Sequence, residues 1–346
     1  MNKTLKQYCK WPNNHITIHY NGNVKLCCIR PYEFDTSFFD YNKRKNIIES
    51  EPDDICKNCL RGNSGETQFT KSYFTEDNDI TSITIILPPI CNLKCVMCGP
   101  EYSSSWISDY NKLNNVSYKH STSFTDYILY VEQLITKQIL TKSVKKIKIV
   151  GGEPMMYETE KFLMLLDLFY LINPDVKLII VTNGTVYKDE IINKLKQFPN
   201  AAINVSIDGI DKVNNYIRYP ADWSVVRDNF IRFKKYIKTD ILHSVSILNF
   251  LEYENIKTFA EDTNSELYSN IVEYPKYLSI KVLSPSIKTL NSNSELNNFI
   301  KEDHEYMHGE TLDYIKKIDY IRNLNILDYI PSFEKIIKTW NANSAN

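Results

Sequence analysis

The sequence predicts an α/β fold in which parallel β-strands alternate with α-helices and wind into a barrel or part of one. Three observations carry this prediction: strand-like apolar runs recur roughly every 25 to 40 residues, amphipathic stretches separate them, and glycines directly follow several of them. Strand–helix alternation of this kind is typical of parallel βα units joined by right-handed crossovers. In such folds the chemistry lies at the carboxyl ends of the strands.

The composition is that of an ordinary soluble globular protein, because 43% of the 346 residues are hydrophobic and 24% are charged. A formal net charge of −1 supplies no basic field, so nucleic acid and membrane surfaces are disfavoured as partners. No apolar run approaches the roughly 20 residues of a membrane span, and the N-terminal stretch MNKTLKQYCKWPNNH lacks a signal-peptide core. We therefore expect a cytoplasmic protein, in which clustered cysteines bind metal more often than they form disulfides.

A cysteine-rich β-hairpin is predicted before the strand–helix region. The stretch HITIHYNGNVKL at 15–26 alternates as strands do around Asn21-Gly22, a pair typical of a type I′ hairpin turn. Such a hairpin would bring the segment near Cys9 back beside Cys27. Four thiols are therefore candidates for one tetrahedral metal site, with Cys28 as the alternative to Cys27: Cys9, Cys27, Cys56 and Cys59.

The first strand of the repeating region is predicted at 83–87, and three cysteines follow it in CNLKCVMCGP. Cys91, Cys95 and Cys98 have the spacing of one helix face, so a buried helical stripe is one interpretation. A Pro-Pro pair before the run and a Gly-Pro pair after it leave room for only a very short helix. We therefore predict a loop in which three thiolates converge on one centre.

The number of thiolates in this loop limits the metal centre that it can hold. Structural zinc takes four ligands, usually as two separated pairs. Three cysteines leave a four-iron cluster with one iron that has no protein ligand, and that iron can bind a cofactor. The loop therefore favours a [4Fe-4S] cluster over zinc.

Five further strands and three helices are predicted downstream of this loop. The strands are expected at 145–150, 176–182, 202–207, 242–248 and 277–283. Amphipathic helices are expected at 160–172, 188–198 and 223–237. After residue 284 the chain turns to polar helical segments, which we expect to close the open side of the barrel or to cover the active site.

Four of the nine glycines lie directly after these predicted strands, in IVGGEP, VTNG and SIDG. Glycine lets backbone approach a ligand closely, although a single such glycine would indicate only a turn. Gly151, Gly152, Gly184 and Gly209 instead mark three successive strand ends, each beside a polar residue. The pattern therefore indicates one constellation at the carboxyl edge of the sheet.

The C-x3-C-x2-C loop together with these tails resembles the radical S-adenosylmethionine (radical SAM) superfamily, over about 81–284. The resemblance implies a partial (β/α)6 barrel. It also implies a [4Fe-4S] cluster on Cys91, Cys95 and Cys98, whose open iron chelates the amino and carboxylate groups of SAM. SAM-binding roles are implied for a further set of residues: Met97, Gly151, Gly152, Glu153, Asn183, Ser206, Asp208 and Arg218.

The roles that the resemblance implies differ along the chain. GGEP would bring backbone and Glu153 to the amino group of SAM, and TNG would bring Asn183 near the ribose. SIDG would offer Ser206 and Asp208 to the ribose or the carboxylate, and Arg218 stands where several members keep a carboxylate-binding arginine. Met97 departs from the family, which often has an aromatic residue there, near the adenine. No catalytic residue is implied beyond the cluster.

The N-terminal cysteines resemble the auxiliary-cluster module called SPASM, in its shorter twitch form. The cues are C-x5-H at Cys9, NGNVKLCC ending at Cys28 and DDICKNC ending at Cys59. Most relatives carry the module after the barrel, whereas here it comes first. The resemblance implies a second [4Fe-4S] cluster, with Cys27 as a ligand by the G-x-V-x-x-C spacing, and zinc is the alternative metal.

The resemblance implies three regions: a cysteine-rich module at 1–75, the barrel at 76–285 and a helical segment at 286–346. It implies an enzyme that takes an electron from a flavodoxin- or ferredoxin-type donor and cleaves SAM to a 5′-deoxyadenosyl radical. That radical would abstract hydrogen from a peptide or protein substrate, with a small molecule such as a sugar or nucleotide as the alternative. Two other classes stay open, namely a zinc-stapled binding protein without catalysis and an electron-transfer iron–sulfur protein.

Overall fold

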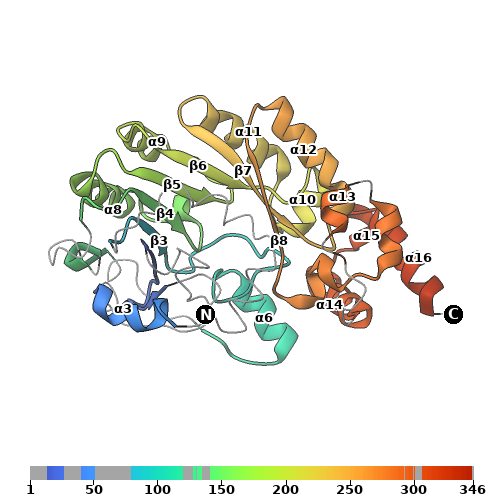
Figure 1. Ribbon diagram of the computed structural model, residues 1–346. Helices are drawn as coiled ribbons and strands as arrows, with labels where there is room; N and C mark the ends of the chain where they lie inside the picture. Colours follow the sequence, from blue (N-terminus) through green and yellow to red (C-terminus); the bar gives the residue numbers. More distant parts are fainter. Residues whose placement is uncertain are drawn as a thin grey trace.

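The computed structural model describes most of the chain from residue 14 onward (Figure 1). The described residues are 14–26, 40–50, 79–119, 128–129, 131–134, 141–291, 293–298, 300 and 306–344. The cysteine loop at 91–98 lies within this set. The predicted N-terminal metal ligands lie outside it, so that metal site stays a prediction: Cys9, Cys27, Cys28, Cys56 and Cys59.

The centre of the fold is one sheet, whose described strands have the order β2-β1-β3-β4-β5-β6-β7-β8. Every neighbouring pair is parallel except β1 and β2, which run antiparallel. The sheet is open, with β2 and β8 at its two edges, and its six strands β3 to β8 confirm the predicted α/β class. The strands are β1 (His15–Ile18), β2 (Val24–Lys25), β3 (Ser82–Ile86), β4 (Lys146–Val150), β5 (Lys177–Thr182), β6 (Ala202–Ser206), β7 (Lys238–Val245) and β8 (Leu267–Ile271).

Helices separate the parallel strands, as βα units require. The helices predicted at 160–172, 188–198 and 223–237 are confirmed as α8, α9 and α11. Figure 1 shows α8, α9, α11 and α12 along one side of the sheet, with α6 on the other. Between β3 and β8 the described helices are α6 (Trp106–Asn114), α8 (Thr159–Ile172), α9 (Asp189–Leu195), α10 (Lys212–Ile217), α11 (Trp223–Lys234) and α12 (Tyr253–Asp262).

The predicted C-terminal helices are confirmed, and the second of them, α14, lies beside α6 (Figure 1). None of the described helices is both long and apolar enough to cross a membrane. The remaining helices are α3 (Tyr41–Ile48), α13 (Ser294–Asn297), α14 (His308–Arg322), α15 (Ile326–Tyr329) and α16 (Phe333–Ser344). Short 3₁₀ helices are η3 (Pro154–Met156), η4 (Phe250–Glu252), η5 (Lys276–Leu278), η6 (Ile280–Val282) and η7 (Pro285–Leu290).

Two apolar clusters meet at the cysteine loop. The first joins the strands to α8, α9, α11 and α12, and alternate residues such as Ile83 and Ile85 of β3 are buried in it. The second joins α10, α14, α15 and α16 to the segments that follow β7 and β8. Cys95 belongs to the first cluster and Val96 to the second. The loop therefore lies at the junction of the barrel with the C-terminal helices.

Two of the predicted strands need correction. The strand expected at 242–248 is β7, which begins at Lys238 and ends at Val245. It ends there because Asn249 Oδ1 accepts the next backbone N–H, that of Ser246, over 2.7 Å and turns the chain. The strand expected at 277–283 does not form, because η5 and η6 occupy that segment and bury its apolar side chains in 3₁₀ turns.

The sixth parallel strand is instead β8, which the sequence analysis did not predict. Its sequence LYSNI carries no apolar run, and every residue in it is only half-buried. An edge strand needs no fully buried face, and apolar patterning therefore does not mark it.

The predicted N-terminal hairpin is confirmed as β1 and β2, but its turn is not type I′. A type I′ turn needs positive φ at both central residues, and of Asn21 and Gly22 only the glycine has one, at 84°. Gly22 N–H instead donates to His19 O over 2.9 Å, so a turn from His19 ends in a left-handed glycine. β1 also pairs in parallel with β3, so the hairpin extends the sheet. The boundaries predicted for the three regions stay predictions.

Candidate functional site

The three cysteines lie in a loop without regular secondary structure, directly after β3 at the carboxyl edge of the sheet. Neighbouring segments fix the loop's backbone. Ser105 Oγ donates to Cys91 O over 2.7 Å, and Val96 N–H donates to Ile217 O at the end of α10 over 2.7 Å. The predicted loop is therefore confirmed, and the alternative of a buried helical stripe is wrong.

The three thiols are shielded from water and influence one another. Cys95 is 9% exposed, and Cys91 and Cys98 are half-buried. Burial raises the pKa of Cys95 to about 11 and the pKa of Cys98 to about 12, and the charges of neighbouring cysteines add to both. Burial also raises the pKa of Cys91. Because the thiolate is the form that binds metal, the loop must lose protons when it takes up a metal centre.

The donor set fits an iron–sulfur cluster held by three protein ligands. Among the residues that the structure describes, no group of three or more His, Cys, Asp or Glu side chains is close enough to hold a single metal ion. A zinc ion gathers its sulfurs at about 2.3 Å each, whereas a cluster attaches each thiolate to a different iron and separates the sulfurs more widely. Three thiols in one loop, which influence one another through their charges, match the number of protein ligands of a four-iron cluster that keeps one iron open.

Gly151 and Gly152, after β4, press against the backbone that leads into the cysteine loop. Both have positive φ, at 87° and 48°. A Cβ atom on Gly152 would stand 2.5 Å from Pro88 O and 2.6 Å from Ile90 O. The two segments therefore approach more closely than any side chain allows, which explains the glycines.

Glu153 ties the tail of β4 to the tail of β5. Its carboxylate is fully buried. Oε1 accepts from Met155 N–H over 2.9 Å and from Thr182 Oγ1 over 2.7 Å, and Oε2 accepts from Asn183 N–H over 2.5 Å. Burial raises the pKa of Glu153, and these hydrogen bonds oppose the rise. Contact of this carboxylate with SAM stays a prediction.

Asn183 brings the tail of β5 to the first cysteine. Its Nδ2 lies 3.8 Å from Cys91 Sγ and donates to Asn92 Oδ1 over 2.9 Å. Its Oδ1 accepts from Thr185 N–H over 2.9 Å. The sequence analysis did not single out Asn92, although this amide directly follows the first cysteine. The structure shows that it reaches the tail of β5.

Asp208 and Arg218 form a buried ion pair beyond the tail of β6. Arg218 Nη1 lies 2.5 Å from Asp208 Oδ2, with 12% and 0% of the two side chains exposed. Asp208 Oδ1 accepts from Ser244 N–H over 2.7 Å. Burial lowers the pKa of Arg218, but the negative charges of Cys95 and Asp208 outweigh this and leave it raised. Arg218 therefore holds a fixed positive charge near the thiols.

Two other predicted residues, Ser206 and Met97, lie at this edge as well. Ser206 ends β6 and is half-buried, and Met97 packs against both apolar clusters. Sequence reasoning missed the roles of three side chains that donate to carbonyl groups of the loop: Trp106, Tyr314 and Arg322. Trp106 directly follows three consecutive serines, at 103–105, but the other two lie on α14, where no local pattern marks them.

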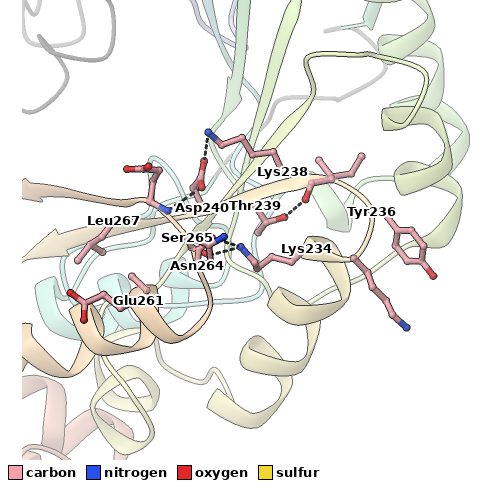
Figure 2. Close-up of a pocket in the computed structure, with 13 residues that line it drawn as sticks. Lys234, Tyr236, Lys238, Thr239, Asp240, Glu261, Asn264, Ser265 and Leu267 are labelled. Atoms are coloured by element: carbon pink, nitrogen blue, oxygen red, sulfur yellow. Dashed lines mark hydrogen bonds and ion pairs between the residues drawn. The ribbon is translucent and has the colours of Figure 1, made fainter.

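Two hollows lie at opposite ends of the sheet. One of about 500 Å³ borders Cys98 and is lined by aromatic rings, among them Tyr277 and Tyr314. The other, of about 810 Å³, lies at the amino ends of β7 and β8 and is rich in lysine (Figure 2). There Lys234 Nζ donates to Ser265 Oγ over 2.7 Å. Of the two, the smaller hollow alone borders a thiol.

Comparison with known families matches residues 85–265, more than half of the chain, to the family described as the radical SAM superfamily. Among curated proteins, a GTP 3′,8-cyclase of Sulfurimonas denitrificans is 25% identical over 67% of this chain and 66% of its own length. A GTP 3′,8-cyclase of Aliarcobacter butzleri is 29% identical over 35% of this chain and 32% of its own length. The chain thus spans less than two thirds of the length of these relatives.

Similar solved structures include native anSMEcpe with bound AdoMet, with a TM-score of 0.46 and 20% identity over 71% of this chain and 62% of that one. Streptococcus suis SuiB bound to S-adenosylmethionine has a TM-score of 0.43 and 17% identity over 82% of this chain and 60% of that one.

Proposed function

The chain belongs to the radical SAM superfamily, and on that premise we propose that it is an enzyme that cleaves SAM reductively and abstracts hydrogen from a substrate. The single observation that carries the proposal is that Cys91, Cys95 and Cys98 lie in one loop at the carboxyl edge of the sheet and influence one another's charge. The tails of β4, β5 and β6 meet the same edge. The residues that would hold the [4Fe-4S] cluster are these three cysteines.

A [4Fe-4S] cluster held by these cysteines would supply the one electron needed to cleave SAM at its sulfonium. That chemistry would give methionine and a 5′-deoxyadenosyl radical able to take a hydrogen atom from the substrate. The chain's part is to bind, to orient and to exclude water. Gly151 and Gly152 let the tail of β4 stand against the loop without an intervening side chain. Arg218 supplies positive charge close to the thiolates, where a carboxylate of SAM would be attracted.

The remaining predicted SAM contacts fall into two groups. Glu153 and Asp208 already accept several protein hydrogen bonds, so in this proposal they shape the site as well as facing SAM. Asn183, Ser206 and Met97 border the loop or end a strand beside it, and we propose them for the ribose and adenine ends of SAM.

Anaerobic reconstitution with iron and sulfide tests the proposal. The expected product is a brown protein that forms 5′-deoxyadenosine and methionine from SAM, with dithionite or with a reduced flavodoxin- or ferredoxin-type donor. A protein that binds zinc and leaves SAM intact would instead support a non-catalytic, zinc-stapled binding protein. Reversible reduction without consumption of SAM would support an electron-transfer role.

We further propose a second [4Fe-4S] cluster on Cys9, Cys27, Cys56 and Cys59, with Cys28 as the alternative to Cys27. The motif spacing supports this proposal, and zinc is the alternative metal. Metal analysis distinguishes the two, because two clusters require about eight irons per chain and one cluster requires about four. A variant with Ala at Cys56 and Cys59 should lose iron from this site alone. Loss of zinc instead would assign the site to zinc.

For the substrate we propose a peptide or protein, on the resemblance of the N-terminal motifs to modules that accompany such chemistry. The test is mass spectrometry of peptides encoded beside the gene after co-expression, with loss of two hydrogens or a new crosslink as the expected result. A nucleotide is the second candidate, because curated relatives at 25% and 29% identity are GTP 3′,8-cyclases. Consumption of GTP by the reconstituted protein in the presence of SAM and reductant would favour it.

A further inference from the structure

The backbone of the cysteine loop depends on side chains from outside the loop for its hydrogen bonds. Buried backbone carbonyls need partners, and this loop forms no ladder of its own. Three consecutive carbonyls, those of residues 94, 95 and 96, each accept from a distant side chain. The donors are Arg322 Nη2 at 2.7 Å, Trp106 Nε1 at 2.8 Å and Tyr314 Oη at 2.7 Å, in that order.

Two of these three donors come from α14, the helix that lies beside α6 in Figure 1. Tyr314 and Arg322 are about 12 Å apart along the helix axis. They reach carbonyls on either side of Cys95, which is itself buried. A shift or rotation of α14 by one residue would break both bonds at once, so the position of the helix and the course of the loop are linked.

Several neighbouring groups hold Arg322 in place. Its side chain is 1% exposed, and Nε lies 3.0 Å from Asp109 Oδ2, whose side chain is 4% exposed. Its guanidinium lies 5.1 Å from the ring centre of Trp106 and 4.9 Å from that of Tyr219. Asp109 also accepts from Lys94 Nζ over 2.8 Å. Burial raises the pKa of Asp109, but the hydrogen bonds from Lys94 and Arg322 outweigh this and lower it.

Compared with an apolar side chain at this position, an arginine changes the stability of the protein little. Its main effect is to fix the directions of the hydrogen bonds. Burying an ion pair costs desolvation energy that its attraction repays only in part, and a well-packed apolar pair is often as stable. The planar guanidinium, however, fixes the directions of its donors. One fork here holds a carboxylate of α6 and a carbonyl of the loop, which locks three segments into one arrangement.

We propose that Arg322 and Tyr314 are positioning residues of the cysteine loop, which make the C-terminal helix α14 part of the cluster site. They act on the thiols through the backbone, by setting the carbonyls on both sides of Cys95. This inference rests on the proposed function for the cluster, but the two hydrogen bonds from α14 to the loop form without metal. Arg322 also contributes positive charge, whereas Tyr314 contributes a neutral hydrogen bond, so the two roles are separable.

The test compares Tyr314→Phe, Arg322→Met and Arg322→Lys with two controls on the same helix, Tyr320→Phe and Lys317→Met. Tyr320 is 87% exposed, and the Lys317 side chain is 57% exposed. The first readout is amide hydrogen exchange in the metal-free protein, at the N–H groups of residues 94 and 96. These groups donate to Tyr219 O and Ile217 O, so they report how often the loop opens. Loss of one hydrogen bond, worth about 1 kcal/mol, should speed this exchange about fivefold in Tyr314→Phe and more in Arg322→Met.

The second readout is the reconstituted protein, in which iron release to a chelator and the reduction potential are measured. Release should be faster in Tyr314→Phe and Arg322→Met than in either control. The potential should fall in Arg322→Met, because a buried positive charge favours the reduced, more negative cluster, and Arg322→Lys should restore most of it. Lysine lacks the fork, so Arg322→Lys should still release iron faster than the control variants.

Unchanged exchange and iron release in Tyr314→Phe, in a protein with wild-type thermal stability, would overturn the proposal and leave α14 as a cover for the apolar core. Tyr314→Phe removes a single hydroxyl, so it keeps the proposal testable if Arg322→Met does not fold. Should the wild-type protein take up no cluster, the proposed function fails, and the exchange measurement on metal-free protein still decides whether α14 positions the loop.

Discussion

The two ends of the parallel sheet differ in how deeply they bury the cations of their ion pairs. At the carboxyl end, Asp208, Arg218 and Glu153 are buried or nearly so, and each has specific partners. At the amino end, around the larger hollow in Figure 2, the Lys238 side chain is 60% exposed and stands 3.6 Å from Asp240. At the amino end the cation of the pair is therefore solvated although Asp240 is buried, whereas both charges of the Arg218–Asp208 pair at the carboxyl end are desolvated.

This difference teaches that the size of a hollow does not identify the site. The amino-end hollow has about 810 Å³ and the one beside Cys98 has about 500 Å³. Buried charges are kept only where a structure holds them with several partners, and they concentrate where a protein positions a ligand. The predictions below test whether the contrast between the two ends holds.

The largest effect is expected at the cysteine loop. Cys95→Ala leaves two thiolates, which cannot anchor a cluster that needs three. Formation of 5′-deoxyadenosine should fall to the background of protein without iron, as measured by chromatography after anaerobic reconstitution. Lys238→Met at the amino end should retain wild-type activity and iron. Full iron content in Cys95→Ala would show that the thiol is not a ligand.

The next effect is expected at the buried ion pair. Arg218→Gln leaves the carboxylate of Asp208 buried and unpaired, so we expect a loss of about 3–5 kcal/mol in the free energy of unfolding. The exposed pair of Arg227 and Asp228 supplies the control, because Arg227→Gln should change stability by less than about 0.5 kcal/mol. Urea denaturation of the metal-free protein measures both. Equal costs for the two variants would break the contrast between buried and exposed charge.

A smaller effect is expected at Glu153. Glu153→Gln directs an amide group at three hydrogen-bond donors and loses a charged acceptor, so the free energy of unfolding should fall by about 1.5–3 kcal/mol. Asp240→Asn at the amino end is the matched control, since Asp240 accepts from Glu266 N–H over 3.2 Å and pairs with an exposed lysine. It should cost less than Glu153→Gln, because the Asp240 carboxylate, although buried, pairs over 3.6 Å with a lysine that is 60% exposed. The opposite ranking in thermal denaturation would contradict this account.

The smallest effect is expected for the pH dependence of folding stability, which should have the same sign for histidines at the two ends of the sheet. Burial lowers the pKa of His15 at the amino end of β1 and of His243 near the carboxyl end of β7. The unfolded chain therefore binds more protons than the folded one below about pH 6.5, so stability is present above that pH and is lost as pH falls.

Each histidine should add to the rise of stability with pH, with a slope that grows as pH falls below about 6.5 and cannot exceed about 1.4 kcal/mol per pH unit. His15→Gln and His243→Gln should each reduce this slope, as measured by urea denaturation between about pH 6.5 and 5.5. A slope that neither variant changes would mean that other groups govern the response.

Sequence reasoning found the strands with a continuous β-branched core and missed the one without it. The runs SITII, KIKIV and KLIIVT form β3, β4 and β5, because their apolar side chains have a face to bury. β8 pairs at an open edge with half-buried polar residues, so its sequence does not differ from that of a loop. Residues 277–283 are apolar enough for a strand, but 3₁₀ turns bury such side chains equally well.

The candidate site shows the same division. The cysteine spacing and the glycine tails are local patterns, and the structure brings Cys91, Asn183 and Gly152 to one edge. The bonds of Tyr314 and Arg322 to the loop join residues 218 and 228 positions apart in the chain. Contacts of that range depend on how helices dock, which local periodicity does not encode.

That separation also sets an order of events during synthesis. When the cysteines leave the ribosome, the helix that will secure their backbone has yet to be translated, and closing so long a segment is entropically slow. The backbone around the nascent cysteines therefore lacks these hydrogen bonds until α14 has been synthesised. Delivering metal to the loop after α14 has docked and delivering it to the loop before that step are different biochemical tasks.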